Sequence, residues 1–157
     1  MTKAKRIRLL NLRDVQLACV AYKGSFQGIG TAYGQLMQWA RAEGFTDAKT
    51  HKTITLYHDD PAVVGMNNVR QSACIITDRD FSPMGDIKPT TLRAGKCAVG
   101  RYEINYFEFK AAWTEMVEWV KENNLKASGK ARFEVYHNNS STHPQNKCII
   151  DICIPVN

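Results

Sequence analysis

An internal repeat constrains this chain more than any single motif does, because two copies of one unit must share a fold. A shift of 79 residues aligns three strand-like segments: LACVAYKG on KCAVGRYE (Val20 on Val99), TITLYHDD on RFEVYHNN (Tyr57 on Tyr136) and SACII on DICIP (Cys74 on Cys153). The halves cover about residues 6–80 and 91–157, and a linker with Pro83, Gly85 and Pro89 joins them.

A helical stretch lies between the first two aligned segments of each half, where the shift becomes 80. Apolar residues recur there with the spacing of one helix face. They are Ile29, Tyr33, Leu36, Met37 and Ala40 in the first half, and Phe109, Trp113, Met116, Val117 and Val120 in the second. Gly44 follows the first helix, and Asn123 and Asn124 follow the second, as expected of left-handed C-terminal caps.

These patterns predict an α+β fold of two pseudo-twofold-related βαββ units. One helix covers only one face of a small sheet. We therefore expect curved antiparallel sheets with two long helices and a central cleft, the usual place for a ligand. The length of 157 residues suits one domain, so residues 1–157 are expected to form a single domain.

Alternation along the strands assigns their faces. Phe133 and Val135 are predicted to pack on the helix, which turns Glu134 and Tyr136 toward the cleft. Two further sets are assigned in the same way: Ala98, Gly100 and Tyr102 to the face of Tyr136, and Ile150, Ile152, Ile154 and Val156 to the core.

Glu134 is the most informative residue, because glutamate is depleted in strands and its repeat partner is Thr55. A carboxylate among tyrosines suits an aromatic cation, which rings attract by roughly 0.5–2 kcal/mol. The alternative interpretation is a half-exposed glutamate paired with Arg132 or Arg101. The helix residue Trp113 is interpreted as core more readily than as a ligand platform.

Other motifs point away from familiar enzyme classes. Gly28, Gly30 and Gly34 open a helix, but no parallel βαβ unit follows, so a dinucleotide site is not predicted. His58 and the acidic pair 59–60 are interpreted as a turn rather than a metal site. No GxSxG or HExxH motif occurs. We predict no catalytic residue, no metal and no cofactor.

The five cysteines are odd in number and form no CxxC pair. We expect all five to be reduced and mostly buried, as in a reducing cytoplasm. The net charge of +6 comes from 21 basic and 15 acidic residues without a basic tail, so direct nucleic-acid binding is not expected. No apolar run could span a bilayer and no signal peptide is recognised, which predicts a cytoplasmic protein without membrane contact.

The tandem unit, together with FEVYHNN at 133–139, YHDDP at 57–61 and DICIPV at 151–156, resembles the GyrI-like family. That family includes the bacterial DNA gyrase inhibitory protein and the effector-binding domains of AraC-type and MerR-type multidrug-responsive regulators. The resemblance implies a channel for small, cationic or aromatic molecules. By this resemblance, the acidic residue of the family's channel falls on Glu134, and the aromatic residues of the channel wall fall on Tyr22, Tyr57, Tyr102, Trp113 and Tyr136.

The leading functional hypothesis is therefore a binding module for a small hydrophobic or cationic ligand. It would act as a standalone drug-binding protein or as the sensor part of a transcription regulator. Two alternatives remain: a hydrolase of reactive DNA-alkylating natural products that uses Glu134, and an interaction protein that inhibits gyrase. DNA gyrase, or a DNA-binding domain on another chain, is the corresponding macromolecular partner.

Overall fold

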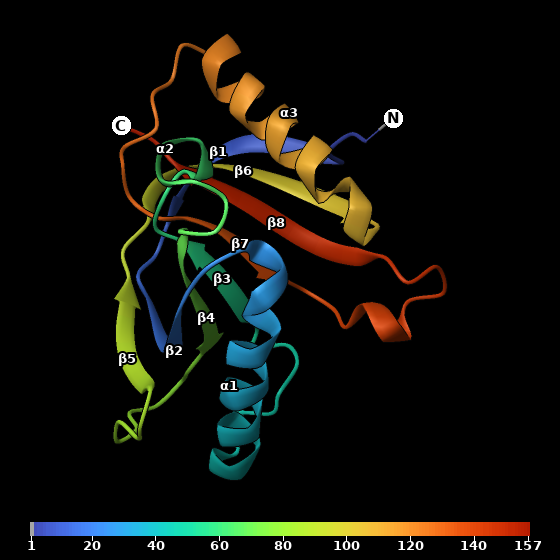
Figure 1. Cartoon of the computed structure of the whole chain (residues 1–157). Helices are drawn as coiled ribbons and strands as arrows, with labels where there is room; N and C mark the ends of the chain where they lie inside the picture. Colours follow the sequence, from blue (N-terminus) through green and yellow to red (C-terminus); the bar gives the residue numbers. More distant parts are fainter. Residues whose placement is uncertain (1) are drawn as a thin grey trace. The chain divides into compact units, whose positions relative to one another are not determined.

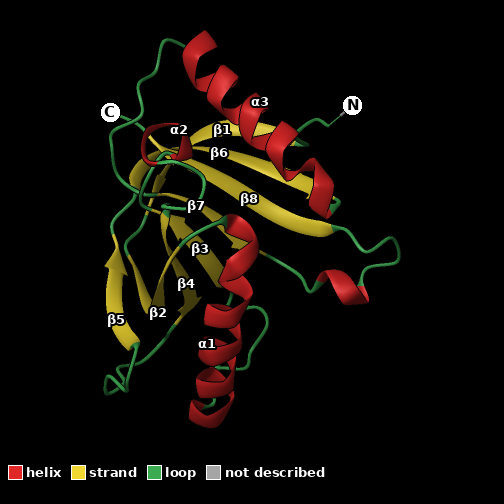
Figure 2. Ribbon diagram, in the orientation of Figure 1, coloured by secondary structure: helices red, strands yellow, loops and turns green. Residues whose placement is uncertain are grey.

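The computed structural model describes residues 2–157 and is α+β, as predicted (Figures 1 and 2). Its eight strands are β1 (Arg6–Leu12), β2 (Val15–Lys23), β3 (Thr53–Tyr57), β4 (Arg70–Ile76), β5 (Ile87–Leu92), β6 (Gly95–Ile104), β7 (Arg132–Tyr136) and β8 (Cys148–Pro155). The two long helices are α1 (Gly30–Glu43) and α3 (Phe109–Glu122). The shorter ones are α2 (Pro61–Val64) and the 3₁₀ turns η1 (Phe26–Ile29), η2 (Tyr106–Glu108) and η3 (Ser140–Thr142).

The chain divides into two compact units that do not coincide with the halves of the sequence. One unit is Asp14–Arg93, with the antiparallel strand order β5-β2-β4-β3. The other combines the residues up to Arg13 with Ala94–Asn157, in the order β1-β6-β8-β7. The chain's first strand therefore belongs with its C-terminal half, and β5 belongs with β2.

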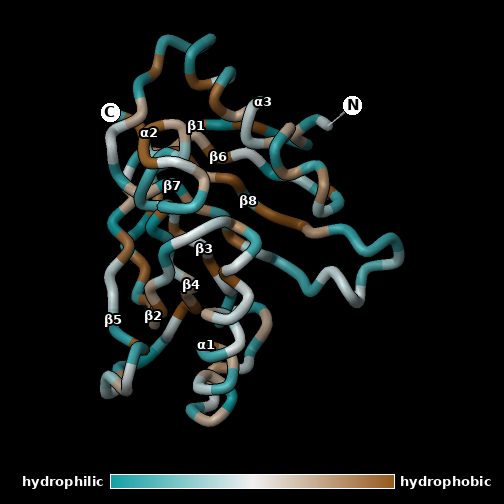
Figure 3. Tube along the Cα trace, in the orientation of Figure 1, coloured by the Kyte–Doolittle hydropathy of each residue, from teal (hydrophilic) through white to brown (hydrophobic). Residues whose placement is uncertain are grey.

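Each long helix covers one face of its own unit's sheet. The buried residues under α1 include Ala18, Val20, Ala73 and Ile75, and those under α3 include Ala98, Tyr102, Ile150, Ile152, Ile154 and Val156. The apolar character of β8 is visible as the brown stretch of its tube in Figure 3. The prediction that these alternating residues of the last strand form a core face is confirmed.

Both helices end as the sequence predicted. Gly44 takes φ 82°, and its N–H donates to the carbonyl oxygens of Ala40 and Arg41. After α3, Asn124 takes φ 58°, which asparagine tolerates better than most residues. The next N–H, that of Leu125, donates to Val120 O at 3.0 Å and closes the last turn.

The prediction that Glu134 faces away from the helix is wrong. Glu134 lies directly opposite Ile152 in the ladder between β7 and β8, and side chains directly opposite each other point to the same face. Ile152 belongs to the core under α3, so Glu134 faces α3, and so does Tyr136 through its partner Ile150. Alternation predicted which side chains share a face, but Phe133 is buried as well, so hydrophobicity did not reveal which face the helix covers.

The pairing registers also correct one aligned strand. Cys74 lies opposite Cys19 in β2, whereas Cys153 lies opposite Val99 in β6. If the two later cysteines correspond, then Cys19 rather than Val20 corresponds to Val99. The shift for this strand is then 80, as it is for the helices.

The expectation that all five cysteines are reduced is also wrong. Cys19 and Cys74 form a disulfide, with their Cα atoms 4.2 Å apart across the ladder. The physical reason is the register, which places them directly opposite each other and which a search for CxxC cannot detect. Cys97, Cys148 and Cys153 are free thiols, and burial raises the pKa of Cys97 to about 11.

Within residues 2–157, no helix combines the length and apolar character that crossing a membrane requires.

Candidate functional site

The candidate site is built around the carboxylate of Glu134 in β7. Glu134 is buried, with only 2% of the residue exposed. The indole Nε1 of Trp113 donates to Oε2 at 2.6 Å, and the hydroxyl of Tyr136 donates to Oε1 at 2.5 Å. Both donors are neutral, and charge-assisted hydrogen bonds of this kind offset part of the cost of burying a carboxylate. Three of the six predicted ligand-binding residues therefore meet at one point.

The secondary structure explains why these three side chains meet. Glu134 and Tyr136 are two residues apart in β7, so they share a face. Trp113 lies on the buried stripe of α3, one turn before Met116, which packs on the same sheet. Trp113 is half-buried and packs against the core under α3, so it is both a core residue and a donor to the carboxylate.

The unit Asp14–Arg93 contains a contact of the same kind without a carboxylate. The hydroxyl of Tyr33 in α1 and Oγ1 of Thr55 in β3 are 2.7 Å apart. Tyr57 follows two residues later, as Tyr136 follows Glu134, and its ring meets Phe26 edge-on with centroids 5.5 Å apart. A polar helix-to-strand contact at this place is thus compatible with a hydroxyl, so the scaffold does not require an acid.

Tyr102 is not part of the group around Glu134. Its side chain is fully buried, and its hydroxyl donates to Glu115 Oε1 at 2.6 Å and contacts Ala112 O at 3.2 Å. Burial, together with the contact to Glu115, raises the pKa of Tyr102 far above its usual range. Its observed contacts are those of a core residue that anchors α3 to β6.

The other two predicted wall residues, Tyr22 and Tyr57, lie in the unit Asp14–Arg93. They flank Gln71 of β4, which lies directly opposite both of them in the two ladders. Gln71 is a buried polar residue that sequence reasoning missed. The signal was available, because the same alternation that places Ala73 and Ile75 under α1 places Gln71 on that face.

The alternative pairing of Glu134 with Arg101 is not observed. Arg101 instead contacts Asp151 at 2.5 and 3.2 Å, and His137 Nε2 lies 2.8 Å from Asp151 Oδ2. Burial acts to raise the pKa of Asp151, but the hydrogen bonds from His137 and Arg101 outweigh it and lower that pKa below its usual range. Asp151 alternates with Ile150 and Ile152, so this cluster lies on the sheet face opposite Glu134.

The metal-capable run that begins at His58 is divided among separate structural roles. His58 Nε2 lies 2.8 Å from Ser72 Oγ, while Asp59 pairs with Arg70 at 2.7 Å. Asp60 caps α2 by accepting from the N–H of Ala62 at 2.9 Å. The interpretation of this run as turn-forming residues agrees with these contacts.

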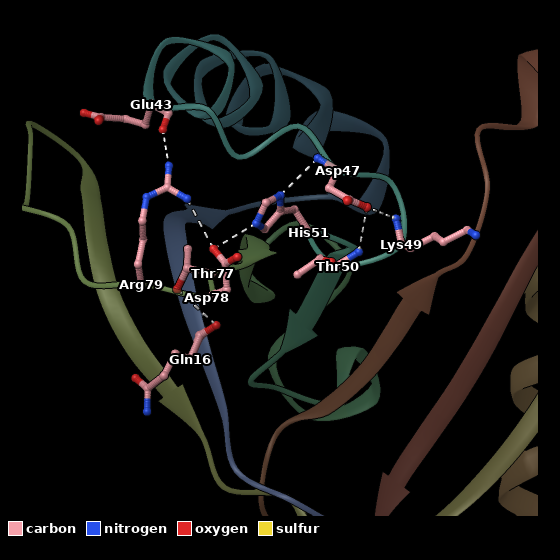
Figure 4. A network of polar contacts seen from close by, with 9 residues as sticks. All are labelled: Gln16, Glu43, Asp47, Lys49, Thr50, His51, Thr77, Asp78 and Arg79. Atoms are coloured by element: carbon pink, nitrogen blue, oxygen red, sulfur yellow. Dashed lines mark hydrogen bonds and ion pairs between the residues drawn. The ribbon is translucent and has the colours of Figure 1, made fainter.

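A polar network closes the loops beside the end of α1 (Figure 4). His51 accepts from the N–H of Asp47 at 3.0 Å and contacts Asp78 at 3.0 Å, while Arg79 donates to the carbonyl oxygen of Glu43. The Arg79 guanidinium also lies 4.1 Å from the ring centre of Phe45. The contacts of His51 with Asp78 and of Arg79 with Glu43 join segments far apart in the sequence, while those of Asp47 with residues 49–51 lie within one loop. We therefore assign this network to stability.

Comparison with known proteins agrees with this fold. A family model, described as the GyrI-like small molecule binding domain, matches residues 6–157. DNA gyrase inhibitor 2 of Dickeya dadantii (strain 3937) is 22% identical over 115 residues, which are 71% of this chain and 71% of that protein.

Three solved structures share the fold at low identity. The EcmrR C-terminal domain matches with a TM-score of 0.76 and 16% identity over 97% of each chain. EcmrR in its complex with DNA matches with a TM-score of 0.82 and 16% identity over 97% of this chain, which spans 57% of the EcmrR chain. The protein SAV2435 bound to tetraphenylphosphonium matches with a TM-score of 0.58 and 13% identity, over 97% of this chain and 94% of the other.

Proposed function

The chain belongs to the GyrI-like small-molecule-binding family, and from this membership we propose that it binds small aromatic cations at Glu134. The observation that carries the proposal is the buried carboxylate, which two neutral aromatic donors hold under α3. The matching place in the other unit holds Thr55, so the fold does not require an acidic residue there, and ligand binding is a reason for Glu134.

The chemistry of the group suits a cation with aromatic substituents. A carboxylate attracts a positive charge more strongly away from water than in it, because the local dielectric constant is lower. The rings of Trp113 and Tyr136 add cation–π attraction of roughly 0.5–2 kcal/mol. The hydrogen bonds of these two side chains also hold the carboxylate in one orientation, so less ordering is left for the ligand to impose.

Relatives support this ligand class and indicate two biological roles. SAV2435 was solved with tetraphenylphosphonium, a lipophilic aromatic cation. EcmrR was solved on DNA, and a chain of this family could serve as the sensor part of such a regulator or as a standalone drug-binding protein. The name of the Dickeya relative makes DNA gyrase the protein partner to test first.

A pair of matched probes tests the proposal. Methyltriphenylphosphonium and triphenylphosphine oxide have similar shapes, but only the first carries a net charge. Titration followed by tryptophan fluorescence is expected to show tighter binding of the cation. At 100 times its Kd the cation should raise the free energy of unfolding by about 2.7 kcal/mol. Equal affinity for the two probes would contradict a site that recognises charge. In a separate assay, hydrolysis of a reactive DNA-alkylating compound by the protein would favour the hydrolase alternative.

A further inference from the structure

Gln71 in β4 carries a buried hydrogen-bond acceptor without a partner. The residue is 1% exposed, and its Nε2 donates to the carbonyl oxygen of Gly24 at 3.0 Å. This bond identifies which amide atom is nitrogen and leaves Oε1 buried, with no hydrogen-bond partner among the residues that the structure describes. A buried acceptor left in this state lowers stability, so its presence calls for a physical reason.

Aromatic side chains surround this acceptor. Tyr22 of β2 and Tyr57 of β3 lie directly opposite Gln71 on its two sides, so the three side chains form one row on the face under α1. The ring of Phe26 meets that of Tyr57 edge-on. The hydroxyl of Tyr22 already donates to Ser25 O at 2.7 Å, so its donor is directed away from Gln71.

The other unit has the same row with an apolar centre. Tyr102 of β6 and Tyr136 of β7 lie directly opposite Ile150 of β8 on its two sides. The chain therefore builds a tyrosine-flanked row around isoleucine in one unit and around glutamine in the other. Isoleucine fills the place without a buried polar atom, which means that packing alone does not account for Gln71.

The segment beside the amide is lightly held. No residue of η1 (Phe26–Ile29) is buried. The chain just before it is tied to the sheet by the bonds from Gln71 and Tyr22 and by that from Gly24 N to Val69 O, at 3.0 Å. A ligand that displaces the Phe26 ring from Tyr57 would reach the row without disturbing the core under α1.

We propose that Gln71 is a specificity-determining residue, whose Oε1 accepts a hydrogen bond from an N–H or O–H group of a bound aromatic ligand. The inference rests on the proposed small-molecule function of the family and concerns a ligand contact made within the unit Asp14–Arg93 alone. Among ligands of equal charge, those that carry an aromatic amine or hydroxyl donor bind better than those in which the donor is methylated.

Proflavine and acridine orange form a suitable pair of probes, because both are fluorescent acridine cations and the second carries methyl groups on the exocyclic amines of the first. The wild-type chain is expected to prefer proflavine. Gln71→Ile introduces the residue that the matching row of the other unit holds. It should reduce the ratio of the affinity for proflavine to that for acridine orange about three- to tenfold, which corresponds to the loss of one hydrogen bond. Loosening of the nearby loop affects both probes alike and cancels in the ratio.

Gln16→Ile is the matched control, because it makes the same substitution at an exposed position of β2 outside the row and leaves Gln71 Oε1 intact. It should keep the wild-type ratio. If Gln71→Ile does not fold, Gln71→Met provides an unbranched replacement without the amide. An unchanged ratio in a folded Gln71 variant that still binds both probes would overturn the inference and would leave the proposed function standing. This result is expected if a buried water, rather than the ligand, donates to Oε1. Failure of both probes to bind the wild-type chain would remove the proposed function and this inference with it.

Discussion

At the scale of single residues, the two units differ mainly in where they place polar atoms. Glu134 and Gln71 are both buried, and each stands where the other unit holds a different kind of residue, Thr55 or Ile150. Comparing the repeats could find Glu134 from the sequence. It did not find Gln71, because the aligned segment SACII begins one residue after it.

A surface residue gives the clearest prediction for pH. Hydrogen bonds from Lys5 and His143, at 2.7 and 2.5 Å, lower the pKa of Glu103 to about 2 from an ordinary value of 4.5. A carboxyl group whose pKa is lower in the folded than in the unfolded state stabilises the protein at pH values above its unfolded-state pKa. That stabilisation is lost as the pH falls toward the folded-state pKa of about 2. Glu103→Gln should therefore lose less stability than the wild type between pH 6 and pH 3, as measured by urea denaturation.

Glu118→Gln, at an exposed position of α3, is the control for this pH series. It should follow the wild-type pH dependence. Identical acid sensitivity of Glu103→Gln and the wild type would show that the contacts with Lys5 and His143 contribute nothing.

At the scale of elements, periodicity predicted the two helices and their caps, but not which sheet face each helix covers. Phe133 and Glu134 are both buried, so apolar alternation could not separate the face under α3 from the opposite one. Only the pairing of Glu134 with Ile152 decides this. The off-by-one alignment of β2 has a similar cause, because small and apolar residues fill both faces of that strand and match at either shift.

The entry to α1 provides a test at this scale. A Cβ on Gly28 would collide with the hydroxyl of Tyr22, which is bonded to Ser25 O. Gly28→Ala should therefore destabilise the protein by about 1–3 kcal/mol. Gly34→Ala lies within α1, where a Cβ meets no atom within 4 Å, and should stabilise it by roughly 0.5–1 kcal/mol. Urea denaturation of both variants measures the contrast, and equal effects would contradict the Tyr22 contact.

At the scale of the whole molecule, the family and the α+β class followed from motifs along the chain, while the cross-links between strands did not. The disulfide of Cys19 and Cys74 depends on the register of β2 against β4, which no local pattern encodes. The assignment of β1 to the C-terminal half is a second such feature, because the repeat signal does not extend to that strand.

The disulfide leads to a prediction for unfolding of the whole chain. It closes a loop with a sequence separation of 55, so in the chain-entropy description it should stabilise the oxidised protein by up to about 4 kcal/mol. The free energies of unfolding of oxidised and reduced protein, measured by urea denaturation, should differ by this amount. Cys148→Ala, which removes a free thiol, should show the same difference. Peptide mapping without reductant should find Cys19 joined to Cys74, and five free thiols in air-oxidised protein would contradict the linkage.

The central claim is that Glu134 reads positive charge, and Glu134→Gln measures this most directly because it keeps the size and removes the charge. Glu115→Gln is the matched control, since it removes an equal charge from the same unit at a carboxylate bonded to Tyr102 instead. Binding of methyltriphenylphosphonium should weaken about 10- to 150-fold in Glu134→Gln, as for the loss of a hydrogen-bonded charge, while triphenylphosphine oxide should lose much less. Glu115→Gln should leave both nearly unchanged. Equal losses for the two probes in Glu134→Gln would mean that this residue shapes the site without reading charge, and the account would be contradicted.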